Sequence, residues 1–116
     1  MLNELIKEID GKEYHFKFSS KKCIDLEKVT GKQFLELLQD TSMANIARLL
    51  KASCKEQVDE YELLDSLMAE MSLEKVMMDI IYEVATISGI ISREDKNKID
   101  RAVEEEKKKE VIEEKK

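Results

Sequence analysis

Few residues of this chain have the types and the spacing that catalysis or metal binding requires. Cys–His catalysis needs a thiol beside an imidazole, and nothing in the sequence places Cys23 or Cys54 beside the single histidine, His15. A zinc site needs several Cys or His ligands, and the chain has no second histidine and no close cysteine pair. We therefore expect His15 to be exposed on a strand and both thiols to be reduced and buried.

Other catalytic patterns are missing from the sequence as well. No glycine-rich phosphate-binding motif occurs. Carboxylates are abundant, but they fall on predicted helix faces and in the charged end of the chain, where they are solvated. The sequence therefore predicts a protein that is not an enzyme and that uses no cofactor and no metal.

One segment, residues 83–101, could bind DNA as a helix-turn-helix. Ala85 and Gly89 have the spacing of the small residue and the turn glycine in such motifs. The basic residues that follow are Arg93, Lys96, Lys98 and Arg101. Acidic residues alternate with them and would repel phosphate, so we expect a plain helix that ends at Gly89. A small helical regulator that binds DNA through residues 83–101 is kept as the alternative function.

Charge limits the partners further. The 116 residues carry a net charge of −6, whereas a nucleic acid or an anionic membrane attracts basic proteins. The longest nearly uncharged apolar stretch, residues 84–92, is much shorter than the roughly 20 residues of a membrane span. The first residues show no signal-peptide pattern. We expect a soluble, cytoplasmic protein without nucleic acid or membrane as its partner.

The beginning of the chain predicts a β-hairpin. Residues 5–9 and 12–18 alternate apolar and polar side chains around Asp10-Gly11, a pair that tolerates the positive φ angles of a two-residue turn. The register of such a turn pairs Ile9 with Lys12, Lys7 with Tyr14 and Leu5 with Phe16. Aromatic side chains then share one face, which other elements must cover because an isolated two-stranded ribbon is marginal in water.

Almost all of the remaining sequence predicts helices. Gly31 suits a left-handed helix end, and the candidate N-caps are Ser19 or Ser20, Ser42, Asp59 and Ser72. The predicted fold class is α+β and mostly α, with an N-terminal β-hairpin, about five helices and a charged C-terminal tail. We predict one hairpin-plus-helices domain over residues 1–91. Residues 92–116 are predicted to be a charged extension that is either helical or disordered.

The most apolar helix is predicted over residues 72–91. One apolar stripe runs from Leu73 to Ile91, and a second stripe of Met78, Ile81 and Ala85 lies beside it. A helix that is apolar over most of its circumference is buried on several sides. It is either the central helix of the domain or is half buried against another subunit.

The methionines suggest a binding surface, because methionine adapts to irregular apolar partners. Those on predicted apolar helix faces are Met43, Met68, Met71, Met77 and Met78. We predict Met77, Met78, Ile81 and Ala85 as partner-binding residues that contact either a client protein or another copy of the chain. Two alternatives stay open: the methionines fill the core in the ordinary way, or these four residues pack in the core of the monomer itself.

Three short motifs occur in order along the first part of the chain. Residues 9–18 read IDGKEYHFKF, residues 26–32 read LEKVTGK, and residues 34–38 read FLELL. This order resembles the small tail assembly chaperones of siphophages, myophages and related prophages of Gram-positive bacteria. Members of that family open with a motif like I-[DN]-G-K-E-Y-x-x-K-F, followed by L-E-K-x-T-G-K and F-L-E-L-L. The resemblance covers about the first 55 residues, and beyond Cys54 it rests on helical character and length.

The resemblance implies a non-enzymatic chaperone encoded in a phage tail gene cluster. Such proteins coat the long, largely helical tape measure protein before tail tube subunits polymerise around it. In many phages a ribosomal frameshift produces a longer form that recruits the tail tube protein, and this chain would be the short product. The implied partners are the tape measure protein, the tail tube protein through a longer form, and further copies of the chain as a homo-oligomer. The implied location is the cytoplasm of the bacterial host, not the mature virion.

Overall fold

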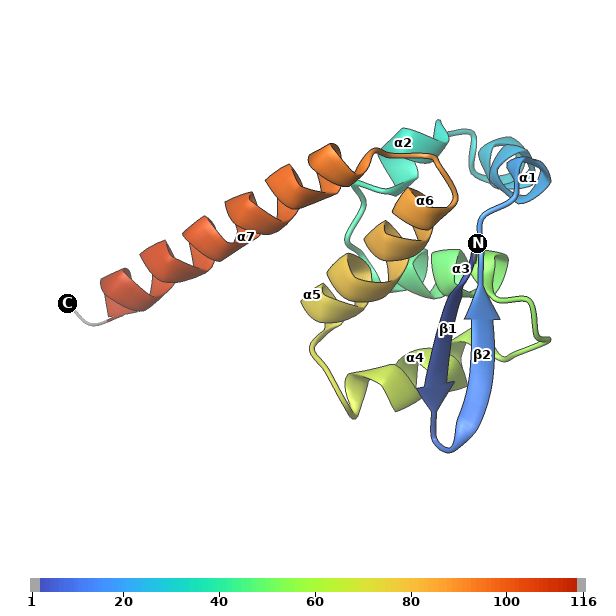
Figure 1. Ribbon diagram of the computed structural model, residues 1–116, viewed down its shortest axis with the longest axis horizontal. Helices are drawn as coiled ribbons and strands as arrows, with labels where there is room; N and C mark the ends of the chain where they lie inside the picture. Colours follow the sequence, from blue (N-terminus) through green and yellow to red (C-terminus); the bar gives the residue numbers. More distant parts are fainter. Residues whose placement is uncertain (1–2, 115–116) are drawn as a thin grey trace.

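The computed structural model in Figure 1 describes residues 3–114. Its hairpin consists of strands β1 (Leu5–Ile9) and β2 (Lys12–Phe16), which pair antiparallel in the predicted register. The turn residues Asp10 and Gly11 have φ angles of 52° and 74°, the positive values that a two-residue hairpin turn of this kind requires. The hairpin is therefore the one that the Asp-Gly pair predicts.

Helices make up most of the remaining chain, so the fold is α+β and mostly α, as predicted. Outside the central helix they are α1 (Ser20–Thr30), α2 (Phe34–Leu37), α3 (Met43–Ser53), α4 (Glu60–Met68) and α7 (Arg93–Glu114). The central helix runs through α5 (Leu73–Lys75), η1 (Val76–Tyr82) and α6 (Glu83–Ile87). The predicted N-caps Ser19, Ser42, Asp59 and Ser72 each accept a hydrogen bond from a backbone N–H in the first turn. Gly31 ends α1 with a left-handed φ of 70°.

The central helix contains a π-helical segment, η1, which the sequence pattern does not predict. In a π-helix each N–H bonds to the carbonyl five residues earlier, so residues five apart, such as Val76 and Ile81, come to the same side. Both of these side chains are fully buried. The helix ends at Ser88, just before Gly89, whose φ is 82°. The π-helical segment thus brings residues from both predicted apolar stripes into one buried face.

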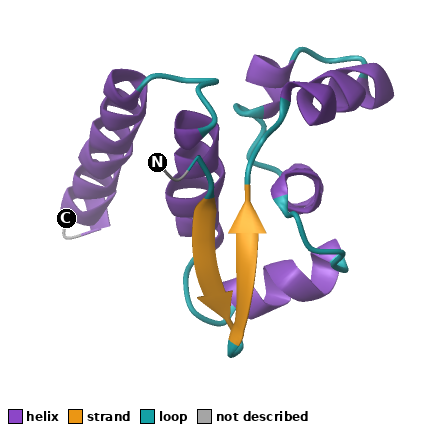
Figure 2. Ribbon diagram, turned by 45° about the vertical axis from the view of Figure 1, so that its right-hand side comes forward, coloured by secondary structure: helices purple, strands orange, loops and turns teal. Residues whose placement is uncertain are grey.

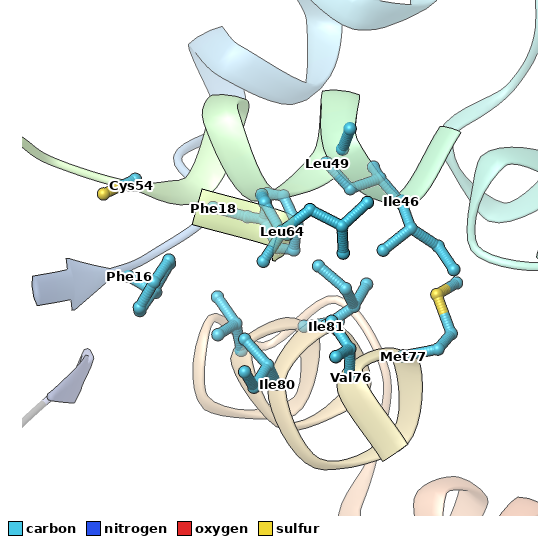
Figure 3. Packing of buried hydrophobic residues seen from close by; sticks show 14 of the residues in the cluster. Phe16, Phe18, Ile46, Leu49, Cys54, Leu64, Val76, Met77, Ile80 and Ile81 are labelled. Atoms are coloured by element: carbon cyan, nitrogen blue, oxygen red, sulfur yellow. The ribbon is translucent and has the colours of Figure 1, made fainter. Parts of the chain in front are cut away.

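The core lies between the hairpin, α3, α4 and the central helix. Figure 3 shows Ile46 of α3, Leu64 of α4 and Ile81 of η1 pointing toward one another, and all three are buried. Phe18, which follows β2, packs edge to face against Phe34 of α2 with the ring centroids 5.1 Å apart. The aromatic face of the hairpin is covered by helices of the same chain.

The outer edge of β2 is also covered by the same chain. The backbone N–H of Lys17 donates to the carbonyl of Ser53, and that of Lys55 donates to the carbonyl of His15, each at 2.8 Å. Phe16 and Cys54 form an antiparallel bridge there. The end of α3 therefore acts as a third, very short strand that supports the two-stranded ribbon.

Of the two predicted forms of the C-terminal extension, the structure shows the helical one. Helix α7 begins at Arg93, close to the predicted boundary at residue 92, and Figure 1 shows it projecting away from the rest of the molecule. Its first turns attach to α6 through ion pairs described below. Within residues 3–114, no helix combines the length and the apolar character that crossing a membrane would need.

Candidate functional site

The four predicted partner-binding residues lie in the central helix, and three of them are buried in the core of the monomer. Met77 is 2% exposed, and Ile81 and Ala85 are fully buried. Only Met78 is partly exposed. For Met77, Ile81 and Ala85 the structure thus shows the alternative that was left open, packing within the monomer. Their predicted contact with a partner would require the core to open.

Met77 and Met78 line a hollow of about 310 Å³ beside the central helix, whereas Ile81 and Ala85 do not. The other lining residues are Thr41, Ile46, Leu73, Glu74, Tyr82 and Ile99. The hydroxyl of Tyr82 donates a hydrogen bond of 2.9 Å to the carbonyl of Leu38, and burial raises the pKa of this phenol. The hollow is therefore mostly apolar and is bounded on one side by α7 through Ile99.

The carboxylate of Glu83 attaches α7 to the central helix. Two guanidinium nitrogens of Arg93 donate to its oxygens at 2.7 and 2.9 Å, and the ammonium of Lys96 lies 3.5 Å away. The hydrogen bonds from Arg93 hold the pKa of Glu83 below its ordinary value. Lys96 is itself buried and also donates to Asp100 at 3.0 Å. Lys98 lies 3.8 Å from a carboxylate oxygen of Glu94, so three of the four basic residues named for DNA binding are paired with acidic residues of the chain.

Helices α1 and α2 expose three large apolar side chains, Ile24, Val29 and Leu35, which we call together the α1–α2 surface, although Ile24 lies about 140° around α1 from Val29. They are 48%, 80% and 55% exposed. A shallow groove of about 310 Å³ runs beside Val29, lined by Leu26, Val29 and Ala52 and by the charged residues Lys22, Asp25 and Arg48. The α1–α2 surface is one of the apolar features of the described chain that are open to a partner without rearrangement of the core.

The sequence patterns do not identify this surface, because the spacing of Leu26 and Val29, with Ile24 beside them, is that of a buried apolar stripe of a helix. An α-helix turns about 100° per residue, so Ile24 and Leu26 point to nearly opposite sides. Of these three residues only Leu26 is buried. Met43 was likewise placed on an apolar face, yet its side chain is 51% exposed. Helical angles could have separated Ile24 from Leu26, but not Val29, which lies only about 60° around the helix from Leu26.

A polar cluster surrounds His15, which lies on a strand as predicted but is only partly exposed. Its side chain is 30% exposed, its Nδ1 is hydrogen-bonded to Glu56, and its Nε2 lies 3.2 Å from a carboxylate oxygen of Glu13. The backbone N–H of His15 donates to the second oxygen of Glu56 at 3.0 Å. Glu56 follows the short third strand, so it reaches the exposed side of β2. Its position could not be derived from the hairpin pattern alone.

Cys54 also contacts this cluster. Its Sγ lies 3.5 Å from the Glu56 oxygen that accepts the backbone N–H of His15. Burial raises the pKa of the Cys54 thiol to about 11, so the thiol is protonated near neutral pH and is a poor nucleophile. Cys54 is buried as predicted, whereas Cys23 is half-buried, and both thiols are free. The cluster is thus suited to holding β2 against the end of α3.

We predict that the His15–Glu56 pair stabilises the fold most in mildly acidic solution. The hydrogen bond to Glu56 raises the pKa of His15 above its ordinary 6.5. The contribution of His15 to the free energy of unfolding is therefore complete below pH 6.5 and is lost as the pH rises through the raised pKa. Although burial alone would raise it, hydrogen bonds from His15 lower the pKa of Glu56 from 4.5 to about 2. The contribution of Glu56 to the free energy of unfolding is complete above pH 4.5 and is lost as the pH falls toward 2.

The measurement is urea unfolding across pH for the wild type and for His15→Gln. The destabilisation caused by the substitution should be largest between pH 4.5 and 6.5 and smaller on either side of that window. Lys17→Gln, on the same strand face, is the matched control, and its effect should not follow the titration of histidine. A His15→Gln deficit that stays constant from mildly acidic to alkaline pH would contradict this account.

Among residues 3–114, no group of three or more His, Cys, Asp or Glu side chains is arranged to hold a metal ion. What the described residues offer to a partner is the α1–α2 surface, the groove beside Val29 and the hollow beside Met78. In comparisons with known proteins, the chain matched no protein-family model, no curated protein and no solved structure.

Proposed function

We propose that this protein is a non-enzymatic phage tail assembly chaperone that binds the tape measure protein during tail assembly. The observation that carries the proposal is the position of the α1–α2 surface. Ile24, Val29 and Leu35 all lie in residues 9–38, the part of the chain whose three motifs resemble that family. The segment that carries the resemblance is therefore also one that exposes apolar side chains to a partner.

The chemistry of this surface supports a helical client. A tape measure protein exposes apolar helix faces before assembly, and an amphipathic helix binds by placing its apolar face in a groove. The groove between α1 and α3 is lined by the apolar side chains of Leu26, Val29 and Ala52 together with three charged side chains. The net charge of −6 on this chain would keep its complex with the tape measure protein soluble.

Recruitment of tail tube subunits is the second part of the proposal. In the family that the chain resembles, a longer, frameshifted product performs this step, and the short form binds the tape measure protein alone. Helix α7 would carry such an added domain away from the α1–α2 surface, because it projects from the body of the molecule (Figure 1). The nucleotide sequence that follows the reading frame tests this part directly, since a tube-recruiting form requires an overlapping second frame.

The test of tape measure binding is co-expression with the long helical protein encoded in the same gene cluster. We expect the wild type to retain that protein during purification, and the double variant Val29→Asp plus Leu35→Asp to retain at least about tenfold less. Each buried apolar side chain contributes roughly 1.5–3 kcal/mol, so two buried charges abolish most of such a contact. Both side chains are exposed, so the variant should keep its thermal unfolding midpoint within a few degrees of the wild type.

Lys28→Asp is the matched control, because it lowers the net charge by the same amount as the double variant. It does so at an exposed position of α1 and removes no apolar side chain. It should retain the tape measure protein like the wild type. Equal retention by the double variant would show that the α1–α2 surface is not the contact. Failure of the wild type to retain the protein, together with salt-dependent binding to DNA, would favour the helical regulator instead.

A further inference from the structure

The two edges of the hairpin differ in how their backbone groups are satisfied. In a hairpin closed by a two-residue turn, Ile9 and Lys12 bond to each other, and every second pair along the strands does the same. The groups of Ile6 and His15, which lie opposite each other, therefore point away from the hairpin. On the β2 side, the N–H of His15 donates to Glu56 and its carbonyl accepts from Lys55. The β2 edge is thus occupied at His15.

The outward groups on the other side define what we call the β1 edge: the backbone N–H and C=O of Ile6 and Glu8. Within residues 3–114 these groups have no hydrogen-bond partner, and β1 pairs with no strand other than β2 (Figure 2). Both residues are exposed, Ile6 to 41%. An exposed strand edge of this kind is a template for pairing with another chain.

The charges along β1 decide which kind of strand can pair there. A second copy of β1 could use the outward groups of both Ile6 and Glu8 in two antiparallel registers. One places Lys7 opposite Lys7 of the other copy, and the other places Glu4 opposite Glu8. Like charges directly opposite each other destabilise a strand pair, which disfavours the Lys7 register, whereas in the second register Glu8 faces a Glu4 that already pairs with Lys55 and so gains no ion pair of its own. A foreign strand with a basic residue opposite Glu8 has no such conflict.

We propose that the β1 edge binds an extended segment of a partner protein by strand addition. The segment has an apolar residue opposite Ile6 and a lysine or arginine two positions away, opposite Glu8. Backbone hydrogen bonds would provide the affinity and these alternate side chains the specificity. This inference is independent of the α1–α2 surface and of the tape measure protein.

A synthetic peptide Thr-Lys-Val-Ile-Thr-Lys-Thr is the probe, because its two lysines flank isoleucine at the same spacing in either strand direction. We expect it to slow hydrogen exchange of the Ile6 and Glu8 amides at least about tenfold. The amides of Leu5, Lys7 and Ile9 already bond to β2 and should change much less. Protection that alternates along the strand separates strand addition from a partner that merely covers the hairpin. No alternating protection at millimolar peptide would overturn the proposal.

Two variants test the backbone and the charge separately. Ile6→Pro removes the outward N–H, which an edge strand tolerates, and should bind the peptide at least about tenfold more weakly than Ile6→Ala, which loses the same side chain but keeps the N–H. Glu8→Lys keeps the backbone intact and should reverse the preference, so that a peptide with glutamates in place of lysines binds better. If Glu8→Lys leaves the preference for the lysine peptide unchanged, the proposed recognition is wrong, whether or not Ile6→Pro folds.

Discussion

Replacing Phe16 with alanine should lower the free energy of unfolding by about 3–5 kcal/mol. The Phe16 side chain is fully buried, and Figure 3 shows it on the hairpin, facing the core between α3 and the central helix. Its removal leaves a cavity at the place where β2 bridges to Cys54, so the loss combines transfer of the ring to water with incomplete collapse of the site. Urea unfolding followed by circular dichroism measures the change.

The size of this effect matters because a domain has only about 5–15 kcal/mol of stability in total. We expect the Phe16→Ala variant to be partly unfolded at moderate temperature, with the helices lost together with the hairpin. Val29→Ala is the matched control, since it shortens a side chain that is 80% exposed, and it should change the stability by no more than about 0.5 kcal/mol. If Phe16→Ala left the helices at full stability, the hairpin would be an appendage and not part of the core.

The features of the fold that sequence patterns predicted are those determined by neighbouring residues. Asp10-Gly11 prescribes the turn, and the turn prescribes which residues lie opposite each other in the hairpin. Ser42 and Ser72 cap helices because a side-chain oxygen reaches an N–H only three residues away. Such signals do not depend on the rest of the chain, so they can be interpreted without a structure.

The burial of the central helix depends on distant residues and could not be predicted in the same way. A helix apolar on most sides fits either a domain centre or an interface with another chain. The central helix lies at the centre of the domain because the hairpin, α3 and α4 surround it. The π-helical segment also brings Val76 and Ile81 to the same side. The partner residues predicted there were therefore placed on the right helix, but three of the four are inaccessible.

The candidate partner surfaces likewise depend on how distant parts of the chain pack together. The exposure of Val29 results from where α3 lies against α1, which no periodic pattern records. The open β1 edge became visible only because residues 53–56 pair with the opposite edge, more than thirty residues away in the sequence. Function in this chain is therefore expected at positions where an element is left uncovered by the others, and those positions require the assembled fold.

Replacing Asn45 with aspartate should destabilise the protein by about 3–5 kcal/mol near neutral pH, although the two side chains have nearly the same shape. The Asn45 side chain is 2% exposed, and its Nδ2 donates to the carbonyls of Leu37 and Asp40, each at 2.7 Å. These two bonds tie the α2–α3 connection to the first turn of α3. In the variant, a buried carboxylate would face two carbonyl oxygens with no donor between them, so both bonds are lost and an unpaired charge is buried.

The pH dependence distinguishes this cause from a simple loss of packing. A protonated aspartic acid can donate one hydrogen bond to either carbonyl, and burial favours the protonated form, so the pKa of the new carboxyl is raised in the folded state. A raised pKa contributes stability at low pH that is lost as the pH increases, so the deficit of Asn45→Asp relative to the wild type should shrink as the pH falls toward about 4. Asn45→Ala is the control: it also removes both bonds but introduces no titratable group, so its deficit relative to the wild type should not follow the titration of a carboxyl. If the deficits of the two variants ran parallel across this range, the unpaired charge would not be the cause, and the loss of the two hydrogen bonds of Asn45 would account for the deficit.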